Sequence, residues 1–293
     1  MHAIRLAVSC PDAAEVAAIA ARLCGATVEP YDDHSPPEGC QAAVLVGPEL
    51  PWRDTVEQLL AAGAHVLVAA NPCPPGDLIE TLSRSARTAG VQLAVVNPDR
   101  YLASRQLVRW QMAAIGEAGL VRLHRWEPAA DRSGETTNLP DPLLRDLDVT
   151  LWLTGRRPEC VYAVEQKSVS LTGRYMQVHL GFPGGGMALL DFDARLPPGD
   201  GYQSLSVIAS AGAAYADDHQ NMQLVYRGGH PQAVRTEERA GRLAAMAQEF
   251  VDALRAGRDL TTPSGTAWRD VFAVADAVTR SLATGRAVTP EER

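Results

Sequence analysis

The stretch 41–72 reads QAAVLVGPELPWRDTVEQLLAAGAHVLVAANP, and it decides the fold class of this chain. Two short apolar runs, at 41–48 and 64–70, flank a segment at 54–63 in which apolar residues recur at helical spacing. Short apolar strands on both sides of a helix are typical of a parallel strand–helix–strand unit, in which both faces of the sheet are buried.

The same alternation continues on both sides of this stretch. Toward the N-terminus, the pattern predicts a strand at 4–9 and a helix at 13–25. Toward the C-terminus, it predicts a helix at 77–90, a strand at 91–97 and a helix at 102–115. Strands and helices that alternate at this spacing predict an α/β domain with a doubly wound parallel sheet.

The pattern changes near residue 121, where short strands of alternating polarity begin to follow one another between Gly and Pro turns. Such strands indicate an antiparallel sheet. Two amphipathic helices, at 242–257 and 267–285, then close the chain. We therefore expect a reduced Rossmann-like parallel-sheet domain at 1–121. It is followed at 122–293 by an α+β domain with an open, mainly antiparallel sheet and helices on one face.

Composition excludes several classes of protein. The net charge is -8, from 27 basic and 35 acidic residues, and no basic run occurs, so nucleic acid is not an expected partner. No apolar stretch reaches the ~20 residues that a membrane helix needs. The five cysteines include no CxxC pair, which disfavours a disulfide framework or a zinc site, so no metal is expected. These features, with no secretory signal at the N-terminus, predict a cytoplasmic protein.

Four stretches of the chain resemble the Gfo/Idh/MocA oxidoreductases. Residues 41–72 are similar to the family's strand, helix and G-K-H-V-L-x-E-K-P segment, and SARTAGVQLAVVNPDRY (85–101) is similar to its A-x-x-x-G-V-x-L-x-V-x-x-x-R-F segment. DPLLRDLDVTLWLTGRRPECVYA (141–163) resembles D-x-G-x-H-x-x-D-x-x-x-x-L-x-G with the following strand, and the tail (249–288) resembles the C-terminal helix pair. The resemblance implies a Rossmann domain, a second domain that binds substrate and packs subunits together, and hydride transfer between NAD(P) and a sugar, polyol or related alcohol.

The sequence departs from this family at the residues that carry its chemistry. The first loop, SCPDAAEV (9–16), contains no glycine, although a glycine turn lets the backbone approach a pyrophosphate. The family's E-K-P lysine falls in AANP (69–72), and the only lysine in the chain is Lys167. Asp141 matches the family's aspartate, but Arg145 stands where the family has its histidine. We therefore expect a degenerate NAD(P) site and no cofactor, with NAD or NADP as the alternative.

Candidate site residues follow from the resemblance and from their places on the expected elements. Arg100 follows a strand at its carboxyl end, where doubly wound sheets place ligands, and Asp141 and Arg145 lie one turn apart on a helix. The predicted catalytic residues are Asp141, Arg145 and Arg100. The predicted substrate-binding residues are Tyr101, Asp148, Lys167 and His179.

These observations leave three functional hypotheses open, and they leave open whether the chain is an enzyme. The first is a pseudo-oxidoreductase subunit, or a cofactor-independent enzyme, that acts on a small sugar-, polyol- or carboxylate-like metabolite. The second is a working NAD(P)-dependent oxidoreductase with unusual cofactor binding, and the third is a protein that binds a small ligand for regulation.

We also expect a homo-oligomer, or a hetero-oligomer with an active family member, formed through the open sheet face. The basis is that apolar residues lie on neighbouring strands and cannot all face one layer of helices, and a large exposed apolar patch is rare on monomers. These residues are Val178, Leu180, Leu190 and Phe192.

Overall fold

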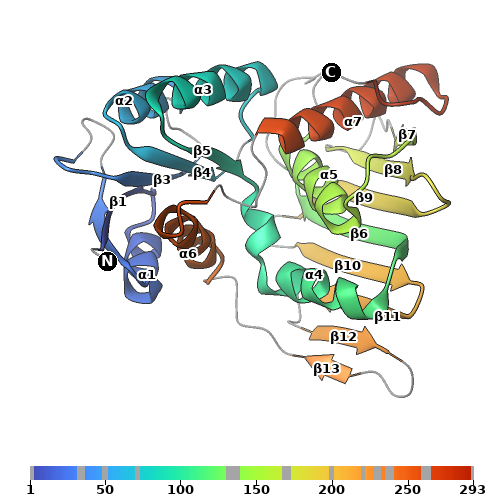
Figure 1. Cartoon of the computed structure of the whole chain (residues 1–293). Coiled ribbons are helices and arrows are strands. Elements are labelled where there is room, and N and C mark those ends of the chain that lie inside the picture. Colours follow the sequence, from blue (N-terminus) through green and yellow to red (C-terminus); the bar gives the residue numbers. More distant parts are fainter. Residues whose placement is uncertain are drawn as a thin grey trace. The chain divides into compact units, whose positions relative to one another are not determined.

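The computed structural model describes eleven ranges of the chain. They are residues 3–31, 37–47, 52–69, 73–129, 139–166, 173–197, 201–218, 222–227, 232–234, 241–258 and 265–291. The chain divides into two compact units (Figure 1). The first unit spans Met1–Leu102 and Arg239–Arg269, and the second spans Ala103–Glu238 and Asp270–Arg293.

The first unit contains a five-stranded parallel sheet in the order β2-β1-β3-β4-β5. Its strands are β1 (Ile4–Ser9), β2 (Ala26–Pro30), β3 (Ala42–Val46), β4 (His65–Ala69) and β5 (Leu93–Val96). Its helices are α1 (Ala13–Arg22), α2 (Trp52–Ala61), α3 (Gly76–Ala89), the short 3-10 helix η1 (Pro98–Tyr101) and α6 (Arg242–Arg255). The chain runs from β1 outward to β2 and then returns to β3 on the other side of β1. The strand order therefore reverses between β1 and β3, the kind of point at which doubly wound sheets bind ligands.

Helices cover both faces of this sheet, with α2 and α3 on one face and α1 and α6 on the other (Figure 1). Leu6, Val44 and Leu67 point to the second face and are fully buried with Ile19 of α1 and Phe250 of α6. Burial of one such side chain stabilises the fold by about 1.5–3 kcal/mol. Burial on both faces explains why these strands read as continuous apolar runs in the sequence.

The second unit contains an eight-stranded sheet in the order β13-β12-β11-β10-β6-β9-β8-β7. All neighbours are antiparallel except β6 and β9, which are parallel. The strands are β6 (Ala118–Pro128), β7 (Cys160–Gln166), β8 (Tyr175–Gly181), β9 (Met187–Leu196), β10 (Tyr202–Ala209), β11 (Gly212–Asp217), β12 (Met222–Tyr226) and β13 (Gln232–Val234). The helices are α4 (Ala103–Ile115), α5 (Asp141–Thr154) and α7 (Gly265–Thr284), of which the second unit includes the part from Asp270 onward.

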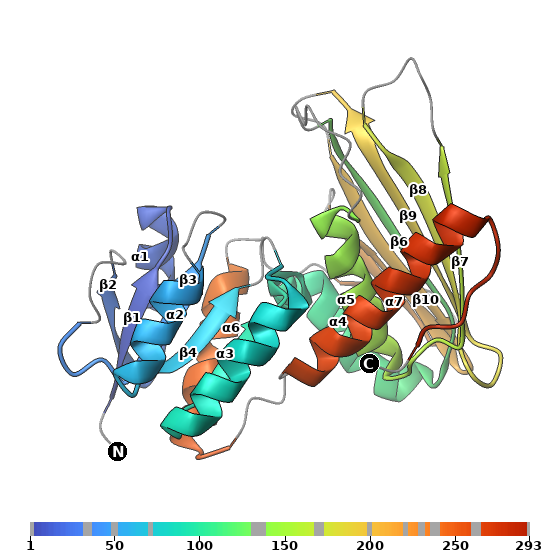
Figure 2. The same ribbon diagram turned by 90° about the horizontal axis from the view of Figure 1, so that it is seen from above.

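Helices α4, α5 and α7 lie on one face of this sheet, and no helix of the described residues covers the other, which we call the open face (Figure 2). The expectation that one helix layer could not cover Val178, Leu180, Leu190 and Phe192 is wrong, because all four are buried beneath the helices. Side chains alternate along each strand, so these four share one face. The most exposed large apolar side chains of the open face are instead Trp126, Tyr162, Val164, Met187, Ile208 and Tyr226.

The predicted fold class, a parallel-sheet domain followed by an open and mainly antiparallel sheet with helices on one face, is confirmed. The two compact units do not follow the expected division into 1–121 and 122–293. Helix α4 packs on β10 and β11, and so belongs to the second unit, whereas α6 packs on α1 and η1 in the first. An amphipathic pattern predicts that a helix has a buried face but not which sheet covers it.

Two further observations concern the described residues as a whole. None of their helices is long and apolar enough to cross a bilayer. The five cysteines, which all lie within the described ranges, form no disulfide.

Candidate functional site

The turn between β1 and α1 lies at the carboxyl edge of the parallel sheet. Asp12 is the N-cap of α1, and its Oδ1 accepts a hydrogen bond of 2.8 Å from the Ala14 N–H. Gly47, directly after β3, has a φ of 144°, and a Cβ there would approach the Pro11 ring to 3.0 Å. The side chain of Asp12 therefore takes a helix N–H that a phosphate would use, and Pro11 packs close to the end of β3.

The predicted residues Arg100 and Tyr101 lie in η1, directly after β5. Both are buried, with 4% and 5% of their surface exposed. The Tyr101 hydroxyl donates a hydrogen bond of 2.7 Å to Glu249 of α6. Asp99 lies 3.4 Å from the guanidinium of Arg242, at the start of α6. These contacts fix the end of β5 against α6.

The predicted residues Asp141, Arg145 and Asp148 lie on one face of the first two turns of α5, in the second unit. Arg145 Nε lies 3.2 Å from Asp141 Oδ2, an i,i+4 ion pair in which both side chains are largely buried. Asp148 is fully buried. The structure thus pairs two of the three predicted residues, Asp141 and Arg145, and Asp148 lies further along the same face of the helix. A guanidinium in such a place suits a carboxylate or other anionic group.

A buried ion pair that sequence reasoning missed anchors the same helix. Arg125 of β6 donates two hydrogen bonds to Asp146 of α5, at 2.8 and 2.7 Å, and both side chains are about 95% buried. Arg125 continues the alternation of Val121 and Leu123 and so shares their buried face, but the sequence does not indicate which carboxylate it meets there. This ion pair anchors α5, the helix that carries the predicted catalytic residues Asp141 and Arg145, to the sheet of the second unit.

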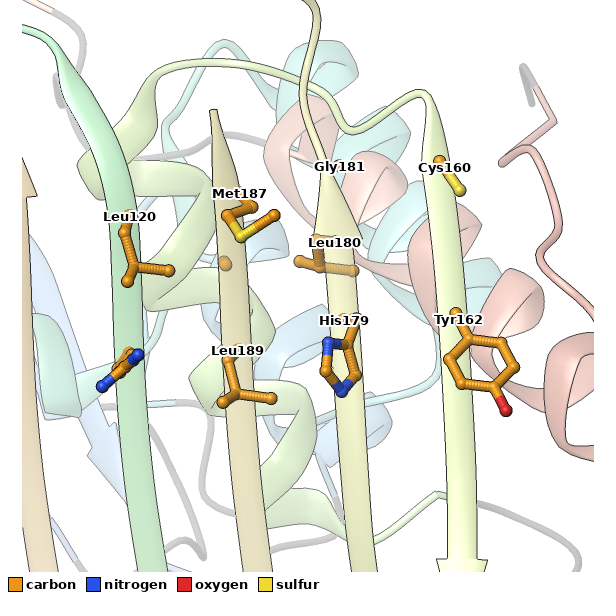
Figure 3. A pocket seen from close by; sticks show the side chains of 10 residues that line it. Leu120, Cys160, Tyr162, His179, Leu180, Gly181, Met187 and Leu189 are labelled. Carbon is orange, nitrogen blue, oxygen red and sulfur yellow. The ribbon is translucent and has the colours of Figure 1, made fainter. Parts of the chain in front are cut away.

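His179 lies on the open face of the second sheet and lines a hollow of about 330 Å³ (Figure 3). Arg122, Leu189, His179 and Tyr162 stand opposite one another in register on four neighbouring strands of this hollow. The His179 and Tyr162 rings are 6.2 Å apart. Lys167, the remaining predicted residue, lies outside the described residues.

A second group on the open face, which the sequence did not reveal, surrounds Asp191 of β9; we call His124, Trp126, Tyr175, Asp191 and Tyr202 the Asp191 cluster. Asp191 Oδ2 lies 3.1 Å from His124 Nδ1 and accepts a hydrogen bond of 3.1 Å from the Trp126 indole N–H. The Trp126 and Tyr202 rings are 4.9 Å apart and tilted by 44°. Only the strand register brings these residues together.

The electrostatics of this cluster favour an ionised carboxylate. Partial burial by itself raises the pKa of Asp191, but hydrogen bonding to His124 and Trp126, together with the nearby Tyr175 hydroxyl, outweighs it and lowers the pKa from 3.8 to about 2. Burial and the neighbouring Asp191 carboxylate raise the pKa of the Tyr175 hydroxyl. Asp191 therefore carries a full negative charge at neutral pH. Among the described residues, no group of three or more His, Cys, Asp or Glu side chains is arranged to hold a metal ion.

Comparison with known proteins gives matches among solved structures alone: no protein-family model and no curated protein matches this chain. A UDP-N-acetylglucosamine 3-dehydrogenase from Acidithiobacillus ferrooxidans is 22% identical, with a TM-score of 0.76, over 96% of this chain and 98% of that chain. A levoglucosan dehydrogenase, solved with NADH and L-sorbose, is 12% identical, with a TM-score of 0.78, over 100% of both chains. An oxidoreductase from Agrobacterium radiobacter, solved with NAD+, L-tartaric acid and magnesium, is 16% identical, with a TM-score of 0.76, over 98% of both chains.

At these identities the likeness establishes the fold, which is that of the Gfo/Idh/MocA-type dehydrogenases. The expectation that the chain has no cofactor is contradicted, because chains that match from end to end were solved with NAD+ or NADH. That expectation depended on the missing glycines and lysine. The five-stranded parallel sheet and its point of reversal between β1 and β3 are nevertheless retained.

Proposed function

We propose that this chain is an NAD(P)-dependent oxidoreductase that transfers a hydride between nicotinamide and a small sugar-, polyol- or carboxylate-like metabolite. The observation that carries the proposal is the extent of the likeness, which reaches 100% of both chains for a dehydrogenase solved with NADH. We place the dinucleotide at the carboxyl edge of the sheet where the strand order reverses, between β1 and β3, next to the turn that joins β1 to α1.

The residues of this turn fit such a cofactor in part. The strand order reverses between β1 and β3, and the carboxyl ends of the strands at such a point are where doubly wound sheets bind dinucleotides. The start of α1, however, has its Ala14 N–H bonded to the Asp12 carboxylate, and a pyrophosphate placed there would meet a negative charge. The usual glycine-turn contact does not fit these residues, so we assign the phosphates no contact at the start of α1.

The chain's own contribution to the chemistry is assigned to the start of α5. Asp141 accepts a hydrogen bond from a substrate hydroxyl at its carboxylate and orients that hydroxyl. Arg145 holds Asp141 in place through their ion pair, and its guanidinium can bind an anionic group of the substrate. The guanidinium remains protonated, so Arg145 cannot take the proton that a histidine would.

Titration of the purified chain with NADH and NADPH, followed by nicotinamide fluorescence, tests this proposal. We expect a dissociation constant in the micromolar range, about -8 kcal/mol. In Asp12→Asn the capping oxygen is kept and the charge is removed, so the variant should bind severalfold more tightly. Glu15→Gln, which removes a charge from the same turn of α1 without touching the cap, is the matched comparison and should tighten binding less than Asp12→Asn does. No binding by the wild type or by Asp12→Asn at about 1 mM would refute the proposal.

A second candidate is a pseudo-oxidoreductase subunit that holds the cofactor without transferring hydride. It is favoured by the absence of lysine from 69–72 and by Arg145, which pairs with Asp141 where the family has histidine. Arg145→His distinguishes the two candidates in an assay of NADH oxidation with a panel of keto sugars. A gain of turnover from zero supports the pseudo-oxidoreductase, whereas loss of an existing turnover supports the first proposal.

We further propose that copies of this chain, or a related subunit, associate through the apolar part of the open face. Met187 and Ile208 are 56% and 54% exposed there, beside the hollow that Leu120 and Leu189 line. Contiguous apolar surface of this kind is uncommon on monomers and marks interaction sites.

A further inference from the structure

The Asp191 cluster combines a partly buried carboxylate with an aromatic surface. The Asp191 side chain is 11% exposed, whereas Trp126 is 38% exposed. Trp126 and Tyr202 stand directly opposite each other in register on β6 and β10, and Asp191 stands opposite His124 on β9 and β6. The indole is thus held between Tyr202 on one side and the carboxylate that its N–H contacts on the other.

The two carboxylate oxygens of Asp191 differ in the hydrogen bonds that they accept. Its Oδ2 receives the contacts from His124 and Trp126, whereas Oδ1 is buried and accepts no hydrogen bond from the described residues. A buried acceptor without a donor costs free energy, and an ionised one costs more. The charge of the carboxylate is therefore only partly compensated by its hydrogen bonds.

Neighbouring charges do not cancel this one. Asp193, two residues along β9 on the same face, is paired with Arg195, whose Nε lies 2.8 Å from its Oδ1. The Arg195 guanidinium in turn lies 4.9 Å above the Tyr175 ring. The structure thus already shows a cation over one aromatic ring of this cluster. Asp191 thus carries its charge beside the Trp126 indole, with His124 Nδ1 3.1 Å away.

We propose that the Asp191 cluster binds an organic ammonium ion, with Trp126 and Tyr202 supplying aromatic faces and Asp191 the opposite charge. An ammonium is attracted to an indole face and to a carboxylate by the same electrostatic force, and aromatic groups beside an acid are the usual way in which proteins recognise alkylated ammonium. A neutral polyol would stack on the indole without needing an ionised carboxylate. The proposal does not rest on hydride transfer or on the cofactor.

Titration of the full chain with choline, followed by tryptophan fluorescence and by calorimetry, tests this inference. The probe carries a permanent charge, and its neutral counterpart of the same shape is 3,3-dimethylbutan-1-ol. We expect choline to bind with a dissociation constant of about 1 mM or tighter, and the neutral alcohol to bind at least tenfold more weakly. Asp191→Asn should lose at least tenfold in choline affinity, whereas Asp191→Glu should retain most of it.

Two control variants identify the site. Trp126→Phe should abolish the fluorescence change while calorimetry still detects binding, and Trp110→Phe, which removes an indole 75% exposed on α4, should change neither. Asp270→Asn removes an acidic charge elsewhere in the second unit and should bind choline as the wild type does. Circular dichroism establishes that each variant is folded. Equal binding of choline and the neutral alcohol, choline binding unchanged in Asp191→Asn, or binding of myo-inositol in preference to choline would each overturn the proposal.

Discussion

The charge on Asp191 makes the stability of the second unit depend on pH in a way that Asp191→Asn removes. The folded-state pKa of Asp191 is about 2, against an ordinary value of 3.8. One pKa unit corresponds to about 1.4 kcal/mol, so the difference contributes about 2 kcal/mol to the free energy of unfolding at neutral pH.

The sign follows from linkage. The folded-state pKa is lowered, so the contribution is present above pH 3.8 and is lost as the pH falls toward 2. About half of it should remain at pH 3 and little at pH 2. Asn keeps the shape and an acceptor oxygen but carries no charge. We therefore expect Asp191→Asn to be about 2 kcal/mol less stable than the wild type at pH 7, with the gap closing below pH 4.

Urea unfolding followed by circular dichroism at pH 7, 5, 4 and 3 measures this gap. Asp270→Asn, at a carboxylate whose side chain is 38% exposed, is the control and should run parallel to the wild type. Titration of the Asp191 carboxyl carbon by NMR gives its pKa directly, and Trp126→Phe should raise that pKa. A gap that is as large at pH 3 as at pH 7, or that is absent at pH 7, would refute the reasoning.

Three further predictions concern a buried ion pair, a glycine after β3 and the association of copies. Arg125→Met should cost the second unit about 3–5 kcal/mol in urea unfolding, since Asp146 is left buried and unpaired, and adding Asp146→Leu should restore most of the loss. Gly47→Ala should lower the melting temperature and cost about 1–2 kcal/mol, because Ala disfavours the positive φ and its Cβ approaches Pro11; an unchanged melting temperature would contradict this. Ile208→Glu should reduce the mass measured by light scattering to that of a monomer if copies pair through the open face, and a wild type that is already monomeric would exclude pairing of identical copies.

Periodicity in the sequence determined the fold class and most of the elements. The apolar runs at 41–48 and 64–70 and the helix between them all exist, because a strand buried on both faces needs apolar residues throughout. The glycine-rich turn GFPGGGM (181–187) joins β8 to β9, with a hydrogen bond of 2.8 Å from the Phe182 N–H to the Gly186 carbonyl. The common helix face of Asp141, Arg145 and Asp148 also followed from sequence, since helical spacing fixes which residues share a face.

Only the tertiary structure decided which residues face each other across strands and which sheet each helix joins. Asp191 and His124 lie 67 positions apart, and α6 lies more than a hundred residues after the sheet it covers. Strand register also put Val178 and Phe192 on the covered face and left Met187 on the open one. The pattern of apolar residues in the sequence predicts that a side chain is buried, but it does not predict which residues cover it. The reason is that the free energy of burial depends on the area removed from water and not on which neighbour covers that area.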